Sequence, residues 1–269
     1  MIPRIKIAIV AGAASLILAV TVQTASTATV SFQQGINGYA GTEDNQIMDP
    51  GTGFQNANIG GRNTFQLGNA SSITTRRTLL RFDVSSLAGL YNSIDSATIA
   101  LKKSNAGSGG TDSADMYAIA DNNADWVEGN SIFVETAGES SWISKRHGEA
   151  VWIGGGGGGA LGALQDSLPG VSTNDPPNTA YVFNLDTALV DQWITGINAG
   201  VVIKEGAEID GAGSGTDLHI DFYSSEFGAL ADAPVRPKLT ISYTEIPEPA
   251  TLSLLGLASL LMVGCRKRV

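Results

Sequence analysis

Apolar and polar residues alternate along most of the chain, which is the pattern of β-strands with one buried face. The strongest segment is 78–84, and 94–102 alternates as regularly. The same period predicts further strands at 29–33, 45–48, 63–67, 115–120, 180–185, 200–204, 218–223 and 238–243. Short strands between Gly-, Asn- and Pro-rich turns predict an all-β protein, an antiparallel jelly roll or β-sandwich that forms a single domain.

Two segments depart from this alternation. In 186–195 the apolar residues Leu189, Val190 and Trp193 recur at helical spacing, which predicts one short helix. Residues 154–159 are six consecutive glycines. Neither a lysine nor a helix start follows them, so we do not expect a phosphate-binding loop there. A flexible surface loop is the prediction.

The first residues have the three parts of a secretory signal peptide. Arg4 and Lys6 precede the apolar run 7–22, and the small residues 26–28 follow it. Together they predict export and cleavage near Ala28, so that 1–28 would be removed. The alternative is an uncleaved anchor helix.

The last residues form a second tripartite pattern. Pro247-Glu248-Pro249 is followed by the uncharged run 250–265 and then by Arg266-Lys267-Arg268. As a helix, that run rises about 24 Å, slightly less than a ~30 Å hydrocarbon core. Snorkelling of the basic residues could cover the difference and would keep the C-terminus cytoplasmic. A transmembrane helix is therefore predicted; a buried core helix is the alternative, although the run has no polar face.

This arrangement resembles the PEP-CTERM sorting tail of Gram-negative bacteria, over residues 246–269. The resemblance implies handling by an exosortase-type processing enzyme at the inner membrane. It implies a final location at the cell surface or in the extracellular matrix, in an organism that makes extracellular polysaccharide. Cys265 departs from the usual tail, either as a processing or lipidation point or as an inert thiol.

Composition limits the chemistry of the region between these segments, about 215 residues that are enough for one large domain. Five of the sixteen Lys and Arg residues and one of the twenty-six Asp and Glu residues lie in the terminal segments, which leaves a net charge of −14. Such a charge disfavours nucleic acid as a partner. Cys265 is the only cysteine, so neither a disulfide nor a cysteine-ligated metal is possible within the domain.

The order of several motifs carries a second resemblance, spanning 29–245. Arg77-Thr78-Leu79-Leu80-Arg81-Phe82-Asp83 comes first, then Trp126-Val127-Glu128-Gly129, and finally Arg236-Pro237-Lys238-Leu239-Thr240-Ile241-Ser242-Tyr243. This order is similar to that of the DNRLRE-type domain of secreted proteins. The resemblance implies a two-sheet sandwich and, more weakly, a carbohydrate ligand, but it does not by itself imply catalysis.

Five residues are candidates for contact with carbohydrate. Trp126, Trp142 and Trp152 could stack on sugar rings, and Trp152 is the best placed because it borders the glycine run. The alternative is that these tryptophans fill the core. Arg81 and Asp83 share one face of a strand and could bind sugar hydroxyls, or could instead organise the strand edge as an ion pair.

Acidic loop residues suggest a structural calcium ion. Glu43, Asp44 and Asp49 lie in the first loop region and Glu226 lies near the end of the domain. Hard cations take oxygen ligands from several loops, so these four could converge on Ca²⁺. The spacing is not that of an EF-hand.

Catalytic signatures are missing from the sequence. It has two histidines, His147 and His219, and neither a Gly-x-Ser-x-Gly elbow nor a His-Glu-x-x-His motif. We therefore expect an exported, non-catalytic carbohydrate-binding module. A purely structural surface or biofilm protein is the alternative. The next is a small enzyme, either a glycoside hydrolase that uses paired carboxylates or a polysaccharide lyase that uses Lys145, Arg146 or His147 with Tyr223.

Overall fold

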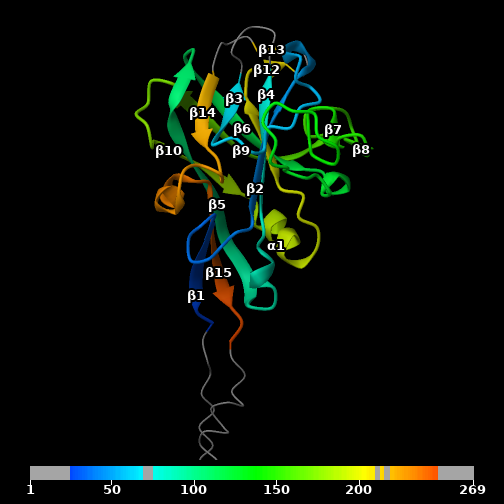
Figure 1. Ribbon diagram of the computed structural model, residues 1–269. Helices are drawn as coiled ribbons and strands as arrows, with labels where there is room; N and C mark the ends of the chain where they lie inside the picture. Colours follow the sequence, from blue (N-terminus) through cyan, green and yellow to red (C-terminus); the bar gives the residue numbers. More distant parts are fainter. Residues whose placement is uncertain (1–24, 69–74, 210–212, 215–218, 248–269) are drawn as a thin grey trace, which may run out of the picture. The chain divides into compact units, whose positions relative to one another are not determined.

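The computed structural model describes residues 25–68, 75–209, 213–214 and 219–247, and it is built mostly of antiparallel β-structure (Figure 1). Residues 26–246 form one compact unit. No helix in these ranges is long and apolar enough to cross a membrane. The apolar parts of both predicted terminal signals, with Glu248, Pro249, Arg266, Lys267 and Arg268, lie outside the described residues.

The predicted strands are present, together with the unpredicted long strand β9 and several short ones. The longer strands are β1 (Thr27–Gln33), β2 (Thr42–Met48), β3 (Thr64–Gly68), β4 (Arg76–Phe82), β5 (Tyr91–Ser108), β6 (Thr111–Ile119), β9 (Leu161–Ser172), β10 (Ala180–Leu185), β11 (Val201–Glu205), β14 (His219–Tyr223) and β15 (Lys238–Glu245). The short ones are β7 (Ser144–Arg146), β8 (Ala150–Val151), β12 (Glu208–Ile209) and β13 (Gly213–Ser214).

The longer strands join into one curled sheet. Its hydrogen-bonded order is β1-β15-β5-β14-β3-β4-β11-β6-β9, with β10 beside β5 and β2 beside β4. β7 pairs with β8, and β12 pairs with β13, as separate ribbons. β1 begins at Thr27, so cleavage near Ala28 would remove the first residues of a strand that pairs with β15.

The concave side of the sheet encloses the inner core. Apolar residues at alternate positions of the strands form this core. In β10, for example, Tyr181, Phe183 and Leu185 are buried, whereas the residues between them are exposed. Phe65, Leu80, Ile99, Phe222 and Ile241 come from five other strands and belong to the same apolar cluster. This core contains the large aliphatic and aromatic side chains that the strand pattern predicted.

One α-helix is present in the described ranges, and it confirms the helical spacing. α1 (Thr187–Thr195) begins after Asp186, whose carboxylate accepts a hydrogen bond from the Ala188 N–H at 2.9 Å. Its buried residues include Val190 and Trp193, which join the inner core. Four 3-10 turns complete the structure: η1 (Pro50–Thr52), η2 (Ser85–Leu87), η3 (Asp121–Asn123) and η4 (Leu230–Val235).

A second apolar cluster, the outer core, lies on the opposite face of β2, β4 and β11. Leu79 and Val202 belong to it, whereas their sequence neighbours Leu80 and Val201 belong to the inner core. Successive side chains of a strand point to opposite faces, so the two clusters lie on either side of one layer. The covering segment, residues 121–160, supplies the tryptophans of the outer core and includes β7 and β8 (Figure 1).

Candidate functional site

Glu43 and Asp44 are neighbours on β2 and therefore face opposite sides of the sheet. The strand register pairs Glu43 with Arg81 and Asp44 with Leu80 on β4. Arg81 lies on the side of the outer core, and Leu80 on the side of the inner core. Glu43 and Asp44, which were predicted to share one calcium site, therefore lie on opposite faces of the sheet.

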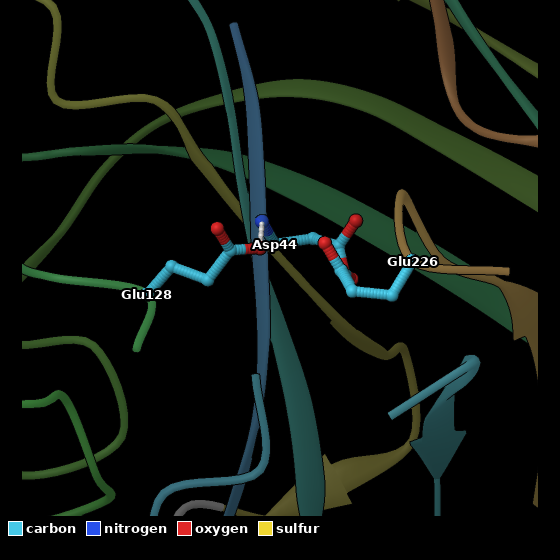
Figure 2. A group of neighbouring side chains, drawn as sticks. All are labelled: Asp44, Glu128 and Glu226. Carbon is cyan, nitrogen blue, oxygen red and sulfur yellow. Dashed lines mark hydrogen bonds between the residues drawn. The ribbon is translucent and has the colours of Figure 1, made fainter. Parts of the chain in front are cut away.

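Asp44, Glu128 and Glu226 form an acidic triad at the edge of β2 (Figure 2). One oxygen from each carboxyl group lies within 4.8 Å of the others. The Asp44 N–H donates to Glu128 Oε1 at 2.6 Å, so this glutamate covers an outward-facing donor of the strand. The triad joins three segments that are distant in sequence: β2, the start of the covering segment, and the turn after β14.

Short hydrogen bonds fix the turn that carries Glu226. The Ser225 N–H donates to Asp44 Oδ2 at 2.7 Å, and the Glu226 N–H donates to the Ser224 hydroxyl at 3.2 Å. The Arg236 guanidinium also holds this turn, through the carbonyl of Phe227 at 2.9 Å. Glu226 Oε2 is shielded from solvent and has no hydrogen-bond partner among the described residues.

Burial and mutual repulsion shift the acidity of the triad. Burial, with the nearby Glu226 charge, raises the pKa of Asp44 well above its ordinary value. Burial, with the charges of Asp44 and Glu226, raises the pKa of Glu128 to about 10. The pKa of Glu226 is raised as well, chiefly by burial. Protonation or a bound cation would each relieve the repulsion between these groups.

The triad contains two of the four residues predicted to bind calcium. Glu43 lies on the other face of β2, and Asp49 lies past the end of that strand, where its N–H donates to the Thr75 carbonyl at 3.1 Å. Glu128 was missed as a ligand, although it stands in the Trp126-Val127-Glu128-Gly129 motif. Its role depends on how the covering segment folds back on β2, which no local pattern of residues specifies.

The two predicted sugar-hydroxyl contacts, Arg81 and Asp83, line one cavity of about 440 Å³. Glu43, Asn198, Ala40 and Gly41 complete the lining of this arginine cavity. Arg81 is ion-paired with Glu43, not with Asp83.

Asp83 instead accepts a hydrogen bond from the Ser85 N–H at 2.9 Å. Hydrogen bonding to the Ser85 side chain, with this backbone bond, lowers the pKa of Asp83. The Arg81 guanidinium also donates to the Trp126 carbonyl at 3.2 Å and lies 4.6 Å from the centre of that ring. The arginine cavity therefore presents fixed charges of both signs.

All three candidate tryptophans are buried in the outer core, with exposed fractions of 1% for Trp126, 7% for Trp142 and 3% for Trp152. Trp126 Nε1 donates to the Ala199 carbonyl at 2.8 Å, and Trp152 Nε1 donates to the Ser141 carbonyl at 2.8 Å. Buried rings offer no open face to a sugar, so the alternative of core packing describes their positions. The sequence pattern could not distinguish sugar stacking from core packing, because the three tryptophans lie outside regular strands.

The glycine run packs against Trp142 rather than Trp152, and it is not a loose loop. Five of its six residues have positive φ, a conformation that other residues rarely adopt. Gly157 is buried, donates to the Trp142 carbonyl at 2.7 Å and accepts from Arg77 Nη1 at 2.8 Å. Trp142, Arg77 and glycines of the run line a second cavity, of about 420 Å³. The run therefore lies at the surface, as predicted, with 154–156 exposed, while 157–159 are buried and form part of the cover over the outer core.

Comparison with known proteins adds no assignment to these sites. No protein-family model matches the chain, and no curated protein is significantly similar to it.

Proposed function

We propose that this chain is an exported surface or matrix protein whose β-sandwich, of the jelly-roll kind, binds carbohydrate without catalysing a reaction. The arginine cavity is the proposed binding site. The observation that supports it is the convergence of Arg81 and Asp83, both expected to bind sugar, in one open and charged cavity with Glu43. Export would proceed through an inner-membrane intermediate processed by an exosortase-type enzyme.

The donors and acceptors of the arginine cavity suit sugar hydroxyls. Each hydroxyl can both donate and accept a hydrogen bond, so neighbouring carboxylates and a guanidinium can each engage it. Arg81 and Glu43 already hold each other, which keeps their side chains in place before a ligand arrives. Binding of individual sugars would be weak because the site is open to solvent.

Glycan binding by conservative variants tests this proposal. Glu43→Gln and Asp83→Asn each remove a charge but keep an oxygen that can still accept the bonds from Arg81 and the Ser85 N–H. We expect each to weaken binding to an immobilised polysaccharide panel about tenfold, with unchanged melting temperature. Wild-type protein that binds no polysaccharide, including the matrix of the producing cell, would leave the purely structural function. Release of reducing ends by the wild type would instead indicate a lyase or hydrolase.

A second proposed function is the binding of a divalent cation, for which Ca²⁺ is the best candidate, by the acidic triad. Three carboxyl groups from three segments supply the oxygen ligands that a hard cation prefers. A cation there would favour the ionised form of groups whose pKa values are otherwise raised. It would also tie the covering segment and the turn after β14 to β2.

Thermal unfolding with calcium and with a chelator tests the cation. We expect millimolar Ca²⁺ to raise the melting temperature at neutral pH and EGTA to reverse the rise. In Glu128→Gln the effect of Ca²⁺ should disappear, whereas in the matched control Glu149→Gln, an exposed residue of the covering segment, it should persist. Equal melting in Ca²⁺ and EGTA for the wild type would refute cation binding.

Truncation after Ile246 tests the sorting tail. The Glu245 N–H donates to the Ser26 carbonyl at 2.8 Å, so the described fold extends to that point and a shorter cut would disturb β15. We expect the truncated protein to fold and to be absent from the cell surface. An unfolded product would show that residues beyond Ile246 belong to the packed domain.

A further inference from the structure

Phe133, in the covering segment, has an unusual backbone conformation. Its φ is 57°, and the two other non-glycine residues with positive φ are Asn37 and Asn178 among the described residues. Asparagine tolerates this region because its short amide can bond locally, but a bulky aromatic residue there is strained. Strain of this kind persists where the surroundings fix it, and it often accompanies a binding function.

The strained residue presents its ring beside a second exposed aromatic ring. Phe54 and Phe133, with exposed fractions of 40% and 39%, are the two exposed aromatic residues in the described part of the chain. Their ring centres are 5.1 Å apart, with an angle of 57° between the planes. The Arg62 guanidinium lies 5.5 Å from the centre of the Phe133 ring. We call Phe54 and Phe133 the aromatic pair.

Backbone hydrogen bonds hold both segments that carry the aromatic pair. The Asn58 N–H donates to the Val134 carbonyl at 2.9 Å, and the Gly61 N–H donates to the Ser131 carbonyl at 3.1 Å. The Ala57 N–H closes a turn by donating to the Phe54 carbonyl at 2.9 Å. The two rings are therefore positioned before any ligand binds, which reduces the entropy lost on binding.

A polar cavity lies next to this turn. Asn56, two residues after Phe54, lines a cavity of about 400 Å³ with Ser144, His147, Glu149 and Val151 among the other lining residues. The Ile143 N–H donates to the Gln55 carbonyl at 3.2 Å, which joins the turn to the hairpin of β7 and β8. The turn that carries Phe54 thus also contributes Asn56 to a polar cavity formed with the covering segment.

We propose that the aromatic pair is a stacking surface for the apolar face of a sugar ring, with the cavity of Asn56, His147 and Glu149 binding hydroxyls of the same polysaccharide. This rests on the proposed carbohydrate binding and assigns it a second contact region. A sugar ring has an apolar face and a polar rim, and this surface offers partners for both. Polar groups bordering the rings favour this ligand over a wholly apolar partner.

Paired leucine variants test the aromatic pair. Phe54→Leu and Phe133→Leu, singly and together, keep most of the apolar volume and the backbone conformation but remove the ring face. Full-length protein solubilised in detergent would be run through native gels that contain a neutral β-glucan, a xylan or an acidic alginate. We expect the double variant to lose about tenfold in affinity for the polysaccharide that retards the wild type. The control Leu90→Ala, another exposed apolar residue, should be retarded like the wild type.

The outcomes separate this inference from the proposed function. Retardation that Glu43→Gln reduces and the leucine variants leave unchanged would overturn the aromatic pair alone. Retardation reduced by the leucine variants, with melting temperatures like that of the wild type, would support it. Reduction by the leucine variants with no effect of Glu43→Gln would support the aromatic pair and reject the arginine cavity. No retardation of the wild type in any gel would overturn both. If the Phe54→Leu protein unfolds, the single Phe133→Leu variant remains the test, and unchanged retardation of that folded protein would overturn the aromatic pair.

Discussion

The inner and outer cores share β4, β6 and β11 but differ in what they are made of. The inner core is a continuous apolar cluster from strands and α1, whereas the outer core places tryptophans next to arginines. Arg77 lies 5.0 Å from the centre of the Trp142 ring, and Arg81 lies beside Trp126 in the same way. Both arginines are also ion-paired, with Glu208 and Glu43 respectively. The inner face is thus held by apolar packing, and the outer face combines apolar packing with paired charges.

Phe183→Ala should have the largest effect, because it removes a fully buried ring from the inner core. We expect a loss of about 3–5 kcal/mol in the free energy of unfolding, measured by urea denaturation. The matched control is Val182→Ala, whose side chain is exposed on the same strand and should change stability by less than about 0.5 kcal/mol. Similar losses in the two variants would refute the placement of β10 against this core.

Arg77→Met tests the polar face of β4. Arg77 and Glu208 form a buried ion pair, with Nε 2.9 Å from Oε1. Removing the arginine leaves a buried carboxylate without its partner, which should cost about 3 kcal/mol. The double variant Arg77→Met/Glu208→Leu should recover most of this loss, because neither charge then remains buried. A double variant that is as unstable as the sum of the single variants would contradict the pairing.

The pH dependence of stability should distinguish the acidic triad from the apolar inner core. Without cations, Glu128 binds its proton more tightly in the folded protein, with a pKa of about 10 against 4.5 for an ordinary glutamate. The folded protein therefore retains a proton that the unfolded protein releases, so the contribution of Glu128 to stability is greatest below pH 4.5 and falls as the pH rises towards 10. One retained proton costs about 1.4 kcal/mol per pH unit, so between pH 5 and 8 in EGTA we expect a loss of up to about 4 kcal/mol.

Calcium provides the control for that pH series. With Ca²⁺ bound, the ionised carboxylates are favoured, so the loss between pH 5 and 8 should become smaller or change to a gain. Glu128→Gln, measured in EGTA, should flatten the dependence because it removes a titrating group from the triad. A wild-type profile in EGTA that is level or rises with pH would contradict the raised pKa values.

The strands of the inner core could be predicted from the sequence, whereas β9 and the covering segment could not. β10 was predicted with its observed bounds because its alternate residues are buried. β9 was missed because it is a largely exposed edge strand, in which Gly162, Pro169 and Gly170 interrupt any alternation. The covering segment is held mostly by individual hydrogen bonds and close contacts of glycines. Such contacts leave no repeating pattern of apolar and polar residues in the sequence, so its fold could not be predicted.

The candidate sites likewise include residues that the sequence pattern could bring together and residues that it could not. Glu43 and Asp44 were grouped because they were predicted to lie in a loop before a strand at 45–48. β2 begins at Thr42 instead, so the two side chains face opposite sides and cannot serve one small site. Arg81 and Asp83, on one strand face, do line one cavity. Glu128 and the aromatic pair come from loops, so their places depend on tertiary contacts that local patterns do not encode.

The smallest expected effect compares two glycines of the run that covers the outer core. Gly155 and Gly157 both have positive φ, so replacement by alanine should strain both backbones by about 1 kcal/mol. A Cβ on Gly155 would meet nothing within 4 Å, whereas one on Gly157 would lie 2.6 Å from Arg77 Nη1. That guanidinium is held by Glu208 and by the Trp142 ring, so it cannot move aside freely. Gly157→Ala should therefore be about 1 kcal/mol less stable than Gly155→Ala in urea unfolding. Equal losses would mean that backbone conformation alone, and not packing against the outer core, determines the need for glycine in this run.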